Sequence, residues 1–156
     1  MIKILFVCLG NICRSSAAQG VFEKIIKDRG IEGNFKVDSA GLIDYHKGEL
    51  SDKRMRHHAY ERGYDLTHRS RPVKMSDFDE FDYIYAMDMQ NISGLQRLNA
   101  EKAQQKVSLL CKLCTQHNVE TIPDPYYGTG KDFGYVLDLL EDACSNLCDL
   151  MQQKIS

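Results

Sequence analysis

The sequence predicts an α/β fold: a doubly wound, four-stranded parallel sheet with helices on both faces. Short apolar segments alternate along the chain with longer segments whose apolar residues recur at helical spacing. The first apolar segment, residues 2–7, is an almost continuous run rich in aliphatic and β-branched side chains, which is typical of a strand covered on both faces. Strands and helices that alternate in this way form parallel sheets with helical crossovers, and this decides the fold class.

The expected elements, in chain order, are a strand at 2–7, a helix from 15 or 16 to 29, a strand at 35–40, a helix at 51–62, a strand at 81–87, a helix at 88–103, a strand at 107–110 and a helix at 132–154. Gly30 and Gly63 follow two of the helices, where a left-handed residue commonly ends a helix. Ser51 is the expected N-cap of the second helix. The two long irregular stretches, 41–50 and 115–131, are expected near the functional site.

Length and composition exclude several classes of protein. At 156 residues the chain fits one domain, residues 1–156, which should bury roughly 68–70% of its unfolded surface without a staple. The net charge of −2 does not suit a nucleic-acid partner, and no apolar run is long enough to cross a membrane. The chain starts without a signal-peptide pattern, and its six cysteines are not needed to stabilise a domain of this size. We therefore expect a cytoplasmic monomer.

The loop after the first strand, residues 7–15, has the features of an anion site. It lies between a parallel strand and a helix, where open α/β sheets place their ligands. A tight loop entering a helix points unpaired backbone N–H groups into one concavity, which binds phosphate without a metal. The same field would favour the thiolate of Cys8, the nucleophilic form. Arg14, six positions later, can bend back and grip two phosphate oxygens with its planar fork.

Three further residues of the loop fit this chemistry. Gly10 permits dihedrals closed to other residues, Asn11 tolerates the left-handed region, and Ser15 offers a hydroxyl to the thiolate. The spacing alone still leaves a second interpretation open, because a cysteine and a later arginine often occur together by chance. In that interpretation Cys8 is a buried strand residue and Arg14 a surface charge.

The segment C-L-G-N-I-C-R-S at residues 8–15 resembles the phosphate loop of the low-molecular-weight protein tyrosine phosphatases. The resemblance extends over nearly the whole chain. It includes Asp38-Ser39-Ala40-Gly41, Asp82-Tyr83-Ile84 with Ala86-Met87-Asp88, and Asp124-Pro125-Tyr126-Tyr127-Gly128. Two positions depart from the family pattern, with Ser16 where proline is frequent and Gln19 where glutamate is frequent. Tyr45 stands where many members carry tryptophan.

The resemblance implies a phosphotyrosine protein phosphatase that hydrolyses aryl phosphate monoesters through a phosphocysteine intermediate, with no cofactor and no metal. Cys8 would be the nucleophile, Arg14 the phosphate clamp, and Asp124 the general acid and then the general base. Asp124 lies between Pro123 and Pro125, which restrict the backbone and could aim its carboxyl group at the leaving-group oxygen. The substrate would be a tyrosine-phosphorylated protein or a small aryl phosphate.

The other implied site residues surround these three. The phosphate would be bound by Leu9, Gly10, Asn11, Ile12, Cys13 and Ser15. Ser39 and His68 would support the loop by hydrogen bonds that involve Asn11 and Ser15. Tyr45, Tyr126 and Tyr127 would wall the cleft against a flat phenyl ring. The position of Cys13 in the same loop, independently of the resemblance, suggests that it protects Cys8, because a neighbouring thiol can form a disulfide with an oxidised cysteine before the oxidation becomes irreversible. The alternative is that Cys13 is a small residue that only packs the loop.

Three alternatives remain. An arsenate reductase on the same scaffold would use the Cys8 loop but would not need the acid Asp124. A phosphate-binding module without catalytic activity would need neither a reactive thiol nor Asp124. The spacing of Cys111 and Cys114, with Cys144 and Cys148 one helical turn apart, also permits a four-thiolate zinc site, although Cys144 and Cys148 suit the apolar face of the last helix.

Overall fold

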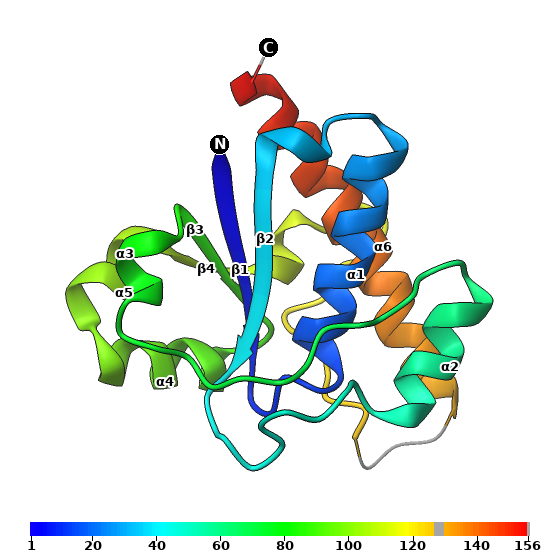
Figure 1. The fold of residues 1–156 in the computed structure, drawn as a ribbon, viewed down its shortest axis with the longest axis horizontal. Helices are drawn as coiled ribbons and strands as arrows, with labels where there is room; N and C mark the ends of the chain where they lie inside the picture. Colours follow the sequence, from blue (N-terminus) through cyan, green and yellow to red (C-terminus); the bar gives the residue numbers. More distant parts are fainter. Residues whose placement is uncertain (127–129, 156) are drawn as a thin grey trace.

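Four parallel strands form one sheet, as predicted. They are β1 (Ile2–Cys8), β2 (Phe35–Gly41), β3 (Tyr83–Ala86) and β4 (Val107–Leu109), and they lie in the order β2-β1-β3-β4. The computed structural model describes residues 1–126 and 130–155. Figure 1 shows the four strands running in the same direction, with the loops that follow them gathered at one end of the molecule and both chain termini at the other.

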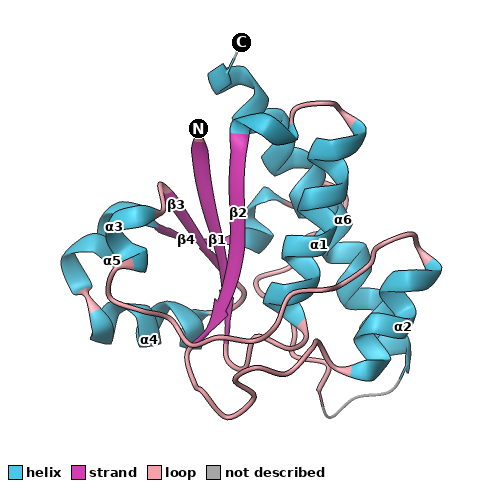
Figure 2. Ribbon diagram, viewed as in Figure 1, coloured by secondary structure: helices cyan, strands magenta, loops and turns pink. Residues whose placement is uncertain are grey.

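Helices cover both faces of this sheet (Figure 2). On one side lie α1 (Arg14–Asp28), α2 (Lys53–Glu61) and the long α6 (Gly130–Ile155). On the other side lie α3 (Asp77–Glu80), α4 (Met89–Leu98) and α5 (Ala100–Lys106). Short 3-10 turns at Glu32–Asn34 and Leu110–Leu113 complete the elements. The predicted doubly wound α/β class is therefore confirmed.

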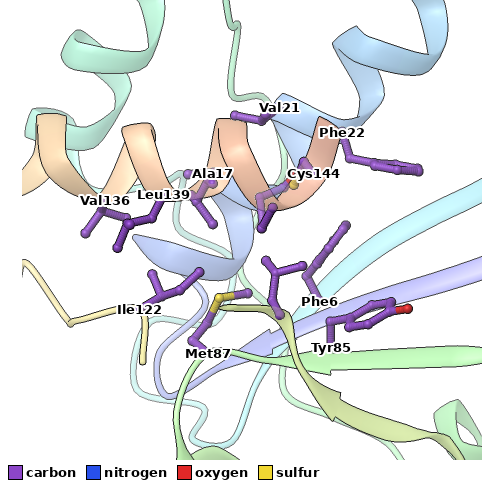
Figure 3. Packing of buried hydrophobic residues seen from close by; sticks show 14 of the residues in the cluster. Phe6, Ala17, Val21, Phe22, Tyr85, Met87, Ile122, Val136, Leu139 and Cys144 are labelled. Carbon is purple, nitrogen blue, oxygen red and sulfur yellow. The ribbon is translucent and has the colours of Figure 1, made fainter. Parts of the chain in front are cut away.

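Strand β1 explains why the sheet needs two helical layers. Its side chains alternate in direction with a period of two. Ile4 and Phe6 belong to the larger core, under α1 and α6, whereas Leu5 and Val7 belong to the core under α4 and α5. All four are fully buried. Figure 3 shows Phe6 in the larger core, facing Phe22 and Cys144 from the helical layer.

The main departure from prediction is the helix expected over residues 88–103. It is interrupted at Asn99, whose backbone is extended (φ −159°, ψ 92°) and whose side chain accepts the N–H of Lys102 as the cap of α5. Asparagine is a preferred N-cap, so a new helix starts where the apolar periodicity alone suggests continuation.

A smaller correction concerns α2, which is capped by Asp52 through the N–H of Arg54 and not by Ser51. None of the helices in the described part of the chain is both long and apolar enough to span a bilayer.

Candidate active site

A cavity of about 350 Å³ opens at the carboxyl end of β1. In the order β2-β1-β3-β4 the connection after β1 runs toward one edge of the sheet, to β2, and the connection after β3 runs toward the other, to β4. Open α/β sheets bind ligands at such switch points. The cavity is lined by the loop after β1 (Cys8, Leu9, Gly10, Ile12, Cys13, Arg14), the loop after β2 (Ile43, Tyr45, His46) and the segment before α6 (Asp124, Tyr126). Both long irregular segments therefore reach the site.

Hydrogen bonds from neighbouring segments to its carbonyl oxygens fix the loop after β1 in place. The carbonyl oxygens of Cys8, Leu9, Gly10 and Ile12 accept hydrogen bonds, in this order, from Leu42 N, Ile43 N, Ser70 Oγ and Asp52 N, at 2.8–3.1 Å. In the described residues no hydrogen bond to protein uses the N–H groups of Gly10, Ile12, Cys13, Arg14 and Ser15. These donors stand at the N-terminus of α1, where the helix dipole also favours an anion. The loop is therefore a backbone cradle suited to phosphate.

Asn11 gives the cradle its curvature. Its φ of 58° is in the left-handed region, as predicted, and it is the only residue other than glycine with a positive φ in the described chain. Gly10 is not in that region, so the expectation of special dihedrals there is wrong. Glycine at this position leaves room for the His46 ring, because a Cβ would lie 3.3 Å from its Cδ2, a tight contact.

Cys8 lies at the base of the cradle and is almost fully buried. Its sulfur accepts the N–H of Asn11 at 3.3 Å and is 3.0 Å from Ser15 Oγ. Ser15 Oγ accepts a hydrogen bond from Asn11 Nδ2 at 2.7 Å, and its own proton can point at the sulfur, 3.0 Å away, or at the more distant Ala40 carbonyl, 3.5 Å away. His68 Nε2 lies 2.9 Å from Asn11 Oδ1 and fixes the orientation of that amide. The N–H of Asn11 thus donates to the Cys8 sulfur, and the Ser15 hydroxyl lies close enough to do the same when the sulfur is a thiolate.

Arg14 lines the cavity and is 2% exposed. One guanidinium nitrogen, Nη1, donates to Asp88 Oδ2 at 2.7 Å and to the carbonyl of Ile122 at 3.0 Å. Nη2 is 3.5 Å from Asp124 Oδ2, and the buried Nε has no protein partner. Burial opposes the positive charge, but Cys8, Asp88 and Asp124 outweigh it and raise the pKa of Arg14. Two nitrogens of a permanently charged fork are therefore available to an anion.

Asp124 approaches the cavity from the segment before α6. Its side chain is 42% exposed, and Oδ1 accepts the N–H of Tyr126 at 3.1 Å. The segment is anchored to the sheet because Ile122 N donates to the carbonyl of Met87 at 2.9 Å, while the Ile122 carbonyl accepts from Arg14. The structure thus brings the candidate acid to the cavity that the thiol and the clamp line, from a part of the chain more than 100 residues away.

Aromatic side chains form the mouth of the cavity. Tyr45 is 81% exposed and packs edge-on against His46, whose ring also lies 5.9 Å from that of Tyr126. Tyr127, the third tyrosine expected here, lies outside the described residues. His46 and Ile43 were not expected at the site. No sequence pattern marks a histidine or an isoleucine in a long loop as a site residue. The structure places His46 at the site, close to Gly10.

The support behind the cradle differs from prediction at Ser39. Its hydroxyl donates to Gln19 Oε1 at 2.6 Å, and no bond to Asn11 or Ser15 occurs among the described residues. Gln19 and Ser16, the two departures from the family pattern, are both buried, and Ser16 Oγ accepts from Ser51 Oγ at 2.8 Å. These neutral pairs join α1 to β2 and to the segment before α2.

The remaining cysteines differ in their surroundings. Burial, reinforced by the charges of Asp52, Cys8 and Asp124, raises the pKa of Cys13, so this thiol is protonated at neutral pH. Cys114 donates to the carbonyl of Leu139, and the buried Cys144 donates to that of Ala18. Over residues 1–126 and 130–155, no cluster of three or more histidine, cysteine or acidic side chains could hold a metal ion.

Fold and cavity together define a class: α/β proteins that bind an anion between a strand and a helix beside a cysteine thiol. The family model described as low molecular weight phosphotyrosine protein phosphatase matches residues 3–156, and the chain belongs to this family of cysteine-dependent hydrolases. The Saccharomyces cerevisiae protein of that name is 38% identical over 86% of this chain and 85% of its own length. The Sus scrofa protein of the same name is 35% identical over 98% of this chain and 95% of its own.

A solved structure supports the same family assignment. The crystal structure of a protein tyrosine phosphatase from Entamoeba histolytica, with Hepes in its active site, superposes with a TM-score of 0.95. The two sequences are 44% identical, and the match covers 100% of both chains.

Proposed function

We propose that this enzyme hydrolyses phosphotyrosine-type monoesters through a phosphocysteine intermediate on Cys8. The observation that carries the proposal is the pairing of a donor-surrounded sulfur with a cradle of unpartnered N–H groups. This combination binds a phosphoryl group and presents a nucleophile to its phosphorus.

In the first step the cradle and Arg14 hold the three non-bridging oxygens of the phosphate. The Cys8 sulfur attacks phosphorus, an S–P bond forms, and the P–O bond to the phenol breaks on the opposite side. Asp124, in its acid form, gives its proton to the departing phenolate oxygen. Nε and Nη2 of Arg14 bind two equatorial oxygens as the phosphorus becomes trigonal bipyramidal, while Nη1 stays on Asp88.

In the second step the same groups exchange roles. Asp124, now a carboxylate, takes a proton from water as the water oxygen attacks phosphorus. The S–P bond breaks, inorganic phosphate forms, and the sulfur leaves as a thiolate. The donors from Ser15 and Asn11 stabilise that leaving thiolate, so they assist this step as well as the first.

The cavity walls support an aryl substrate. Tyr45, Tyr126 and the apolar Ile12 offer surface against which a phenyl ring can pack. The substrate is then a tyrosine-phosphorylated protein or a small aryl phosphate, and no group in this chemistry calls for a metal or another cofactor.

The test is to trap the intermediate. Wild-type enzyme quenched in acid during turnover of p-nitrophenyl phosphate should carry one phosphoryl group on the peptide that contains Cys8, as measured by mass spectrometry. Cys8→Ser should still bind inorganic phosphate but should neither hydrolyse p-nitrophenyl phosphate nor carry a phosphoryl group after the quench. Cys114→Ser is the matched loss of another thiol, and it should hydrolyse the substrate and carry the phosphoryl group. Turnover above about a tenth of the wild-type value in Cys8→Ser would contradict the proposal.

Two outcomes would favour the alternatives. Thiol-dependent reduction of arsenate without hydrolysis of p-nitrophenyl phosphate would indicate an arsenate reductase. Binding of phosphate without either reaction would indicate a phosphate-binding module.

A further inference from the structure

A second hollow adjoins the active-site cavity on the side of α4. It has a volume of about 650 Å³ and shares two of its walls, Leu9 and Ile43, with the cavity itself. Met89 and Leu98 of α4 continue the apolar surface away from the cavity, and all four of these side chains are exposed. This surface, the α4 groove, is mainly apolar and starts at the mouth of the active site, with Gln90 and Ser93 as polar members of its lining.

The floor of the α4 groove is closed by a tight contact between the helix and the loop after β2. Gly94 faces Leu42, and a Cβ on Gly94 would lie 2.7 Å from Leu42 Cδ1. Any larger residue at position 94 would push the end of the Leu42 side chain aside. The groove is therefore lined both by α4 and by the loop after β2.

A cation stands at the distal end. Arg97 lines the α4 groove and is exposed, and it forms no ion pair or side-chain hydrogen bond with the described residues. Arg97 lies on the same helix face as Met89, eight positions later, which is about 12 Å along the axis. An extended polypeptide covers that distance in roughly three to four residues.

We propose that the α4 groove binds the polypeptide next to the phosphotyrosine of a protein substrate. An apolar side chain adjacent to the phosphotyrosine would lie between the shared walls and Met89, and an acidic side chain three to four residues farther on would reach Arg97. Continuity with the catalytic cavity selects this occupant, because any chain leaving that mouth toward α4 must cross the groove. The inference rests on the proposed phosphatase activity and names the sequence context that the enzyme selects.

The experiment compares kcat/KM for phosphotyrosyl peptides of equal length that differ at one position. One pair carries leucine or serine next to the phosphotyrosine. A second pair keeps leucine there and carries aspartate or lysine three to four residues beyond that leucine. Each pair is made on the N-terminal and on the C-terminal side of the phosphotyrosine. The wild type should prefer leucine over serine by about tenfold and aspartate over lysine by about two- to fivefold on the same side. p-Nitrophenyl phosphate, which has no flanking residues, reports the catalytic step alone.

The variants assign these preferences to the α4 groove. Met89→Ser should remove most of the leucine preference and Arg97→Glu should reverse the charge preference, both with unchanged turnover of p-nitrophenyl phosphate. Met75→Ser is the matched control, because Met75 is 53% exposed, close to the 60% of Met89, and does not line the groove. This control should keep both preferences.

Three results would overturn the proposal. Peptide preferences that are absent in the wild type, or unchanged in Met89→Ser and Arg97→Glu, with p-nitrophenyl phosphate still hydrolysed, would refute the α4 groove alone. Failure of the wild type to hydrolyse p-nitrophenyl phosphate would refute the proposed function and this inference together. A wild-type dimer that Met89→Ser dissociates, with peptide preferences unchanged, would instead assign the groove to a second copy of the chain.

Discussion

Replacing Arg14 by lysine tests the clamp while it keeps the positive charge. The Arg14 guanidinium is held at one end, because Nη1 donates to Asp88 and to the Ile122 carbonyl, while Nε has no protein partner and Nη2 has only the 3.5 Å ion pair with Asp124. In the proposed mechanism Nε and Nη2 bind the phosphate. A lysine ammonium has no planar fork, and the strong bond to Asp88 would hold it away from the substrate. Arg14→Lys therefore loses two charge-assisted hydrogen bonds to the reacting phosphoryl group.

Each such bond contributes about 1.5–3 kcal/mol, so the transition state loses about 3–6 kcal/mol. At about 1.4 kcal/mol per factor of ten, kcat/KM for p-nitrophenyl phosphate should fall roughly 10²–10⁴-fold. Affinity for inorganic phosphate should fall as well, since the same fork binds the ground state. Arg54→Lys is the matched control: Arg54 does not line the cavity but donates to the Tyr126 carbonyl, so its replacement should change kcat/KM by less than about fivefold. The reasoning would be refuted by a folded Arg14→Lys enzyme with kcat/KM within about tenfold of wild type.

Asp124→Ala should lower kcat roughly 10²–10⁴-fold for aryl phosphates with poor leaving groups and less for good ones, and a loss independent of the leaving-group pKa would contradict the acid role. Peroxide should inactivate the enzyme through a Cys8–Cys13 disulfide that dithiothreitol reverses, and Cys13→Ser should recover poorly; equal recovery would exclude the protective role. Burial would raise the pKa of Asp142, but hydrogen bonds from His117 and from the N–H groups of residues 115–117 prevail and lower it. The Asp142 carboxylate stabilises the fold at pH values above its unfolded pKa of about 3.9, and this contribution is lost as the pH falls through its lower folded pKa. Asp142→Asn should therefore lower the free energy of unfolding by about 1.5–3 kcal/mol at neutral pH. Urea unfolding should find this difference shrinking in acid, and a constant difference would refute the assignment.

The parts of the site that the sequence predicts are local ones. Residues 8–15 follow one another, so the order of a strand, a cysteine, a tight turn and an arginine at a helix start already implies the cradle. The left-handed backbone of Asn11 was predictable for the same reason, because few residue types tolerate it. The approach of Asp124 to Arg14 is not local, and only the resemblance to the family indicated it.

The errors arise where a side chain chooses between partners that are distant in sequence. Ser39 was expected to bond with Asn11 or Ser15, but its hydroxyl donates instead to Gln19 of the neighbouring helix α1. His46 reaches the cavity because Gly10 leaves room for its ring. Asn99 is a different case. Its preference for capping a helix was visible in the sequence, but the prediction followed the helical periodicity of the residues around it, and Asn99 does cap α5.

Asp88 explains why the clamp and the α4 groove share one rigid element. One of its carboxylate oxygens caps α4 by accepting the N–H of Asn91 at 2.8 Å, and the other accepts from Arg14 at 2.7 Å. The Asn91 side chain returns a bond to the N–H of Asp88, which fixes the capping residue in place. The position of Arg14 is therefore set by the first turn of α4, the same turn that carries Met89. A substrate segment that packs against this turn contacts the element that orients the clamp, so flanking residues can affect kcat as well as KM.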